Sequence, residues 1–94
     1  MPRPKAQVEA GLLAKGFVQR ETHHRYFVYM SHDGKVSRAR TKTSHTPRMK
    51  DIPDNLLSQM AHQCALTKRQ LLELVDCPLD RAAYEALLVE QGML

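Results

Sequence analysis

The spacing of hydrophobic residues changes along the first half of the chain. Apolar side chains recur at helical spacing over residues 4–15, which predicts a short helix, and Gly16 is a natural stop. β-branched and aromatic residues or strict alternation then predict three short strands, over 17–20, 25–30 and 36–41. Asp33-Gly34 favours a hairpin turn between the second and third strands, because both residues tolerate positive φ angles.

Helical spacing returns in the second half of the chain. One helix is predicted from about 53 to 64, with an apolar stripe that should cover the sheet. The run Thr67-Lys68-Arg69-Gln70 has the pattern of a capping box and predicts the start of the next helix. A last helix is predicted over about 79–91, ending at Gly92. Its predicted buried residues are Leu79, Ala83, Tyr84, Leu87 and Leu88.

The order of these elements predicts an α+β fold. An α-β-β-β-α core forms a two-layer sandwich on a three-stranded antiparallel sheet, and a C-terminal α-hairpin follows. We expect residues 1–66 to form the core and residues 67–94 a helical extension of the same domain, packed on or beside that core. Alternation in the third strand places Arg38 and Arg40 on one side, which we expect to face solvent or a ligand.

Charge is divided unevenly between the two halves of the chain. The net charge is +4, but residues 1–50 hold eleven Lys or Arg against three Asp or Glu, a balance of +8, and residues 51–94 hold three against seven, a balance of −4. A basic half of this kind favours a polyanionic partner, and nucleic acid is the usual one. The alternative is a solvated basic face without a ligand.

Several short motifs of the basic half occur in a fixed order. They are Gly16-Phe17, Thr22-His23-His24-Arg25-Tyr26, Asp33-Gly34, Ser44-His45 and Lys50-Asp51-Ile52. Taken together over residues 5–67, this set resembles HicA-type toxins, the YcfA-like domains of bacterial toxin–antitoxin pairs. The resemblance implies a double-stranded-RNA-binding-like fold, cleavage of messenger RNA, and a HicB-like antitoxin as protein partner. Two departures are the replacement of the family's Gly-Ser by Glu21-Thr22 and the extension after residue 67, which has no counterpart.

Metal-free RNA cleavage needs a base for the 2′-hydroxyl proton, an acid for the departing 5′-oxygen, and cations for the phosphate. Histidine is suited to the proton transfers at neutral pH. The resemblance assigns the catalytic role to His23, and His45 is the second candidate. The candidates for binding phosphate are Arg25, Arg38, Arg40, Lys42 and Lys50. The structural alternative for His23 is a histidine that merely caps the hairpin.

Other chemistry has weaker support in the sequence. Cys64 and Cys77 show no CxxC spacing, and the histidines fit no known zinc pattern, so we expect no metal and two buried, reduced thiols. No phosphate-binding loop or dinucleotide fingerprint is present, and no cofactor is expected. No run is long enough for a membrane span, and no signal peptide is recognisable, so we expect a cytoplasmic protein without a membrane partner.

Two functions therefore compete, and a pure protein-interaction domain without RNA affinity is a third possibility. The first is a HicA-like endoribonuclease that acts on messenger RNA without a metal, and the second is a non-catalytic RNA-binding module on the same fold. In the second strand, Tyr26, Phe27 and Tyr29 could stack on unpaired bases, although at most one or two of them can be exposed. The C-terminal hairpin is expected to pack on its own core, and self-association into a homo-oligomer or binding of a protein partner are the alternatives.

Overall fold

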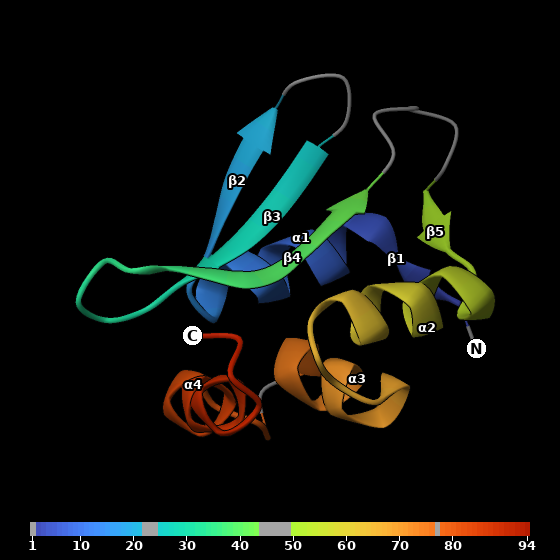
Figure 1. The fold of residues 1–94 in the computed structure, drawn as a ribbon. Coiled ribbons are helices and arrows are strands. Elements are labelled where there is room, and N and C mark those ends of the chain that lie inside the picture. Colours follow the sequence, from blue (N-terminus) through green and yellow to red (C-terminus); the bar gives the residue numbers. More distant parts are fainter. Residues whose placement is uncertain (1, 22–24, 44–49, 77) are drawn as a thin grey trace.

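A computed structural model describes residues 2–21, 25–43, 50–76 and 78–94 of the chain (Figure 1). Its helices are α1 (Lys5–Ala14), α2 (Asp54–Gln63), α3 (Lys68–Asp76) and α4 (Arg81–Glu90). Its strands are β1 (Arg3–Pro4), β2 (Phe17–Glu21), β3 (Arg25–Met30), β4 (Val36–Thr43) and β5 (Asp51–Ile52). The predicted α+β class, with a C-terminal helical hairpin, is confirmed.

The main sheet has three antiparallel strands in the order β2-β3-β4, as the sequence predicts. A second, two-stranded sheet pairs β1 with β5, and the backbone N–H of Lys5 donates to the carbonyl of Lys50 at 2.7 Å beside it. This sheet was not predicted from the sequence, because two-residue strands are too short to show a period of two.

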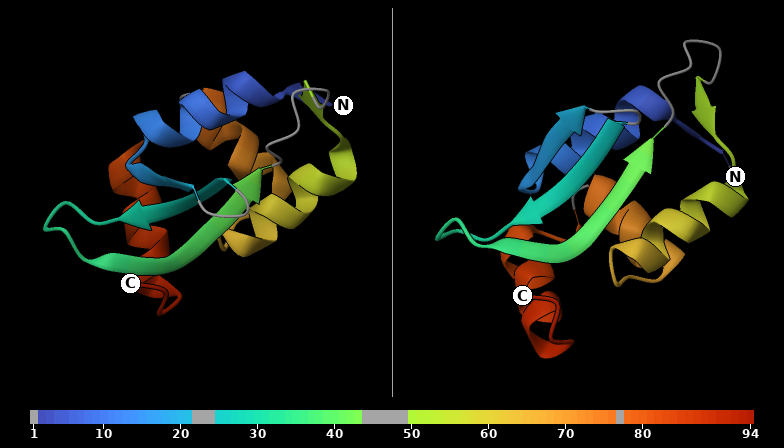
Figure 2. Two further views of the ribbon diagram at one scale, coloured as in Figure 1. Left: turned by 90° about the horizontal axis from the view of Figure 1, so that it is seen from above. Right: turned by 45° about the horizontal axis from the view of Figure 1, so that its top comes forward.

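The helices lie on one side of the three-stranded sheet, which leaves the other side uncovered by helix (Figures 1 and 2). The covered side, here called the inner face, carries the fully buried Phe27, Tyr29 and Ala39. Each of the four helices adds buried residues to the same core: Val8 and Leu12, Leu57 and Met60, Leu71 and Leu74, Tyr84 and Leu88. The C-terminal hairpin therefore packs on the sheet and the first two helices through one continuous core.

Side-chain caps fix where the last two helices begin. At α3 the backbone N–H of Gln70 donates to the Thr67 hydroxyl, and the Thr67 N–H donates to the Gln70 side chain, so the predicted capping box is confirmed. At α4 the side chain of Asp80 accepts from the N–H of Ala83. Tyr84 and Leu88, one turn apart, face the core, whereas Ala83 points away from that stripe and is exposed, so the prediction that Ala83 is buried was wrong.

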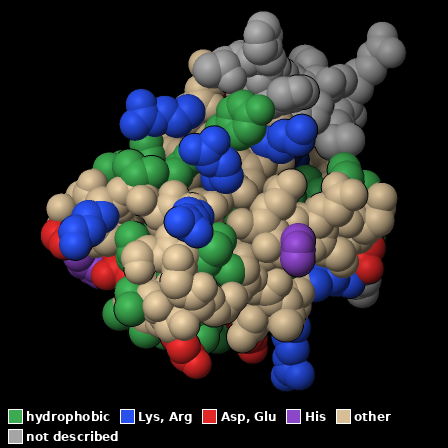
Figure 3. Space-filling model, viewed as in Figure 1, with side chains coloured by type: hydrophobic (Ala, Val, Ile, Leu, Met, Phe, Trp, Pro, Cys, Tyr) green, Lys and Arg blue, Asp and Glu red, His purple; other side chains and the backbone are tan. Residues whose placement is uncertain are grey.

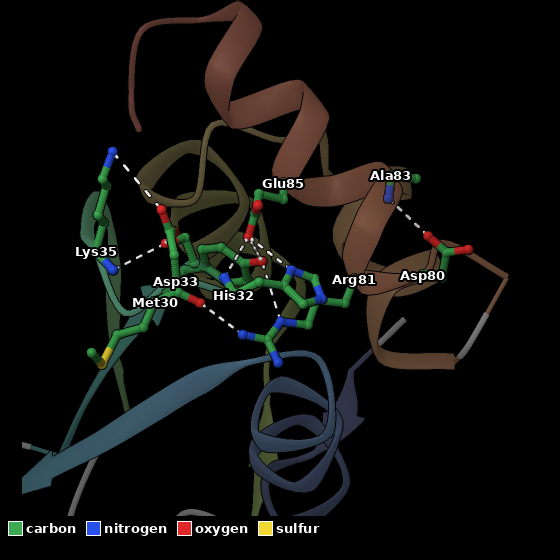
Figure 4. Close-up of polar contacts among 10 residues, drawn as sticks. Met30, His32, Asp33, Lys35, Asp80, Arg81, Ala83 and Glu85 are labelled. Carbon is green, nitrogen blue, oxygen red and sulfur yellow. Dashed lines mark hydrogen bonds and ion pairs between the residues drawn. The ribbon is translucent and has the colours of Figure 1, made fainter.

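Polar contacts tie α4 to the β3–β4 hairpin (Figure 4). Glu85 accepts a hydrogen bond from the Tyr29 hydroxyl at 2.6 Å and another from the backbone N–H of His32 at 3.2 Å. Arg81 donates to the carbonyl of Met30 at 3.0 Å. The Arg81 guanidinium also lies close to the Cα of Gly16, where a Cβ would be 2.5 Å from Nε, so both its positive φ and its neighbour require glycine there. These contacts hold the hairpin end of the sheet against the C-terminal helix.

A buried lysine joins the first and third helices. Lys15 follows α1, is 9% exposed, and donates from Nζ to the carbonyls of Leu74 and Leu79 at 2.6 and 2.8 Å. Leu74 belongs to the last turn of α3, where carbonyl groups lack helical partners. Lys15 therefore satisfies the C-terminal end of α3 and does not contribute to the exposed basic surface.

Candidate nucleic-acid interface

The uncovered side of the three-stranded sheet combines apolar and basic side chains. We name it the outer sheet face and define it by the outward residues Val18, Arg20, Tyr26, Val28, Met30, Val36, Arg38, Arg40 and Lys42. A shallow depression in it is lined by all of these except Arg38 and Lys42. In Figure 3, blue Lys and Arg side chains surround green hydrophobic ones over the region of the sheet.

Strand register arranges this face in rows. Tyr26 on the central strand pairs with Arg20 on one side and with Lys42 on the other. Two residues further along β3, Val28 pairs with Val18 and with Arg40. Residues paired across strands lie side by side on one face of a sheet. Each apolar residue of the central strand in these two rows therefore has a cation beside it.

The cations of this face are not neutralised within the part of the chain that the structure describes. None of its ion pairs involves Arg20, Arg38, Arg40 or Lys42, and all four residues are exposed. The prediction that Arg38 and Arg40 face away from the core is confirmed by the alternating burial of β4. Four positive charges without acidic partners on one sheet face attract an anion by long-range electrostatics.

Arg25, which the sequence analysis grouped with the phosphate-binding residues, lies apart from these cations. Its guanidinium makes ion pairs at 3.0 Å with Glu9 of α1 and with Glu21 of β2. The side-chain hydrogen bond to Glu9 is the largest of the effects that raise the pKa of Arg25. Side chains alternate along β3, so Arg25 shares the inner face with Phe27 and is opposite in direction to Tyr26.

Lys50 also lies away from the outer sheet face. It is exposed and directly precedes β5, so it belongs to the edge of the separate two-stranded sheet. The structure therefore groups Arg38, Arg40 and Lys42, and adds Arg20, which the sequence analysis did not select. The signal for Arg20 was available, because it is two residues beyond Val18 on a predicted strand.

The two candidate catalytic histidines, His23 and His45, lie outside the described residues, as does His24. Strands β2 and β4, which directly precede residues 22–24 and 44–49, end at the same end of the sheet. Glu21 pairs with Arg25, and Arg25 pairs with Thr43, in the last row before residues 22–24 and 44–49. The next row of the sheet contains Arg20, Tyr26 and Lys42, whose side chains belong to the outer sheet face.

The histidines and the cysteine that the structure describes do not belong to the outer sheet face. His32 is an exposed turn residue with Nδ1 3.4 Å from Glu85, and His62 is exposed on α2. Cys64 is buried, and desolvation raises the pKa of its thiol to about 12, so it is not an available nucleophile. Cys77 lies outside the described residues. Over the described ranges, no cluster of three His, Cys, Asp or Glu side chains could hold a metal ion.

Glu9, an acidic residue that was not predicted to belong to the site, binds two residues in the last row of the inner face. Glu9 accepts hydrogen bonds from Arg25 at 3.0 Å and from the Thr43 hydroxyl at 2.6 Å. It therefore joins α1 to β3 and β4 in the last row of the sheet. The position of Glu9 on a predicted helix did not indicate these hydrogen bonds, because they connect residues that are far apart in the chain.

Comparison with known proteins adds no identification. Neither family models, nor curated proteins, nor solved structures give a match to this chain. None of the helices in the described part of the chain is long and apolar enough to cross a bilayer.

Proposed function

We propose that this protein binds RNA on the outer sheet face and cleaves it as a HicA-like endoribonuclease, with His23 as the residue that transfers a proton. The observation that carries the binding step is the set of four exposed cations, next to apolar side chains, that have no acidic partner among the residues the structure describes. Arginine and lysine in such a setting bind phosphate groups, which supply most of the affinity of proteins for nucleic acid.

The cleavage step rests on the resemblance to HicA-type toxins and on the position of His23 in the chain. A base takes the proton of the 2′-hydroxyl, the oxygen attacks the neighbouring phosphorus, and an acid protonates the 5′-oxygen as its bond to phosphorus breaks. Bound RNA would extend toward the end of the sheet from which residues 22–24 and 44–49 leave. His45 is the candidate for the second proton transfer.

A non-catalytic RNA-binding module is the second candidate, and one observation favours it. In the row next to the histidine segments, the single cation, Arg25, is bound by Glu9 and Glu21. A catalytic site for RNA needs cations that stabilise charge on the phosphorane, and this one is already paired. Under this alternative, the outer sheet face binds RNA and no bond is cleaved.

The experiment that tests the proposal incubates RNA with the purified protein, with and without EDTA, beside His23→Ala and His45→Ala. Cleavage that persists in EDTA and is lost in His23→Ala is the expected result, and a positioned acid or base typically contributes about 10²–10⁴-fold to the rate. Cleavage abolished by EDTA contradicts the metal-independent mechanism. Intact RNA with wild-type protein, together with retained RNA binding, establishes the non-catalytic module instead.

A matched pair of charge changes tests the binding surface. Arg40→Gln removes one cation from the outer sheet face, and Arg69→Gln removes one exposed cation from α3, outside that face. We expect weaker RNA binding and a smaller salt dependence only for Arg40→Gln, because released counterions belong to contacted phosphates. Equal losses for both variants would mean that net charge, and not this surface, determines binding.

A further inference from the structure

The outer sheet face is apolar along its middle and basic along its sides. Its central strand contributes the half-buried Tyr26 and Met30 and, between them, Val28, which is only 8% exposed; we name these three residues the β3 stripe. The neighbouring strand contributes Arg38, Arg40 and Lys42, which we name the β4 cations. Arg20 stands on the other side of the stripe, on β2. The two groups run side by side along adjacent strands.

This arrangement matches the two chemical parts of an unpaired nucleotide. A base has a flat apolar face, and a phosphate carries a negative charge at a short distance from it. Tyr26 lies directly beside Lys42, and Val28 directly beside Arg40, in the register of β3 and β4. One row of the face therefore offers an apolar or aromatic surface and a cation at the spacing of paired strands.

We propose that an unpaired RNA strand lies lengthwise on this face, with bases against the exposed parts of the β3 stripe, above all Tyr26, and phosphates against the β4 cations. This inference rests on the proposed RNA-binding function and adds its substrate class. In a duplex the base faces are stacked on one another, so only single-stranded RNA can present them to Tyr26. Every base has such a face, so binding tolerates many sequences.

Tyr26 is the side chain that makes stacking possible at this site. The chain has three tyrosines and no tryptophan. Tyr29 and Tyr84 are fully buried against Phe17 and each other, whereas Tyr26 is half-buried and lines the depression. Stacking of a base on a tyrosine ring quenches its fluorescence, so the tyrosine signal of this protein reports on Tyr26 when RNA binds.

Three labelled oligonucleotides of one length test the inference by fluorescence anisotropy at fixed salt. They are a single-stranded 2′-O-methyl RNA, the same strand annealed to its complement, and an abasic strand with the same phosphates. The blocked 2′-hydroxyl prevents cleavage, so binding is measured separately from catalysis. We expect the single strand to bind most tightly, with quenching of tyrosine fluorescence.

Variants at two neighbouring positions separate base contacts from phosphate contacts. Tyr26→Val keeps a residue suited to a strand and removes the ring, and we expect it to weaken binding of the base-bearing strand about five- to hundredfold without changing abasic binding. Tyr26→Phe should keep the affinity and lose the quenching. Lys42→Gln should weaken binding of both strands. Thermal unfolding of each variant verifies that it folds.

The outcomes distinguish this inference from the proposed function. If base-bearing and abasic strands bind equally well, and Tyr26→Val binds both as wild type does, base stacking is overturned while RNA binding stands. Tighter binding of the duplex than of the single strand also overturns it. If wild-type protein binds none of the three oligonucleotides, the proposed function fails, and this inference fails with it. Unchanged tyrosine fluorescence in wild type on saturation would remove Tyr26 from the contact.

Discussion

The two faces of the three-stranded sheet use arginine in different ways. On the inner side, Arg25 is bound by two glutamates, and Arg81 reaches from α4 to the carbonyl of Met30. On the outer side, Arg38 and Arg40 are exposed and have no acidic partner among the described residues. The difference teaches that a basic half-chain contains both cations bound by acidic residues and cations that face outward, and that the direction of the side chain on its strand separates Arg25 from Arg38 and Arg40.

Two tyrosines on opposite faces of β3 provide the largest expected contrast. Tyr29→Ala removes a fully buried ring that contacts Phe17 and Tyr84 and donates to Glu85, so we expect the free energy of unfolding to fall by about 3–5 kcal/mol. Tyr26→Ala, at a half-buried position on the outer sheet face, should cost less, about 1 kcal/mol. Urea unfolding of both variants measures the difference, and equal losses would contradict the assignment of faces.

RNA affinity should show the reverse contrast. Changing both Arg38 and Arg40 to Gln should weaken RNA binding by about 3 kcal/mol at low salt, taking about 1.5 kcal/mol for each charge-assisted contact. The slope of log affinity against log salt should fall by about 1.4, since each phosphate contact on a single strand contributes about 0.7. Arg81→Gln should leave that slope unchanged. Salt titrations of binding check both statements, and a flatter slope in Arg81→Gln would place this arginine at the interface.

The same arginines can be compared for stability. Arg81→Gln removes the donors to the Met30 carbonyl and to the Tyr29 hydroxyl, so we expect unfolding to become easier by about 1–3 kcal/mol. Arg40→Gln should change stability by no more than about 0.5 kcal/mol. Chemical unfolding curves give both values. A loss in Arg40→Gln as large as that in Arg81→Gln would mean that Arg40 also contributes to stability.

The smallest expected effect is the pH dependence that Glu85 gives to α4. The hydrogen bond from Tyr29 is the largest of the effects that lower the pKa of Glu85. Because the pKa is lower in the folded protein, this carboxylate stabilises the fold above its unfolded pKa, and the contribution is lost as pH falls through the folded value. Glu85→Gln should therefore flatten the acid side of the stability curve, as thermal unfolding across acidic pH will measure. A curve as steep as that of wild type would assign the acid sensitivity to other carboxylates.

Most of the fold could be predicted because its elements are marked by local chemistry. Aromatic and β-branched residues identified β3 with both of its ends, and Thr67 and Gln70 marked the start of α3. The two-stranded sheet could not be predicted, since it joins Arg3–Pro4 to Asp51–Ile52 across the chain. The burial of Ala83 was predicted wrongly because the apolar spacing of α4 does not show where the edge of the buried stripe lies, and that stripe is centred on Tyr84 and Leu88.

The candidate site could be predicted only in part. Alternation in β4 was enough to place Arg38 and Arg40 on an exposed face. The ion pair of Arg25 with Glu9 could not be predicted, because Glu9 lies in another element, although the position of Arg25 one residue before Tyr26 already indicated that the two side chains point to opposite faces. The predicted roles of His23 and His45 stay predictions, since both residues lie outside the described part of the chain.

The alternating burial of β4 has a consequence for how this protein can change over evolutionary time. Every second residue of the strand, from Ser37 to Thr43, faces the interior, and the residues between them face outward. Selection for a folded protein therefore acts on one set of positions, and selection for a ligand acts on the other. The outward set can acquire a new recognition preference by single substitutions while the fold is retained.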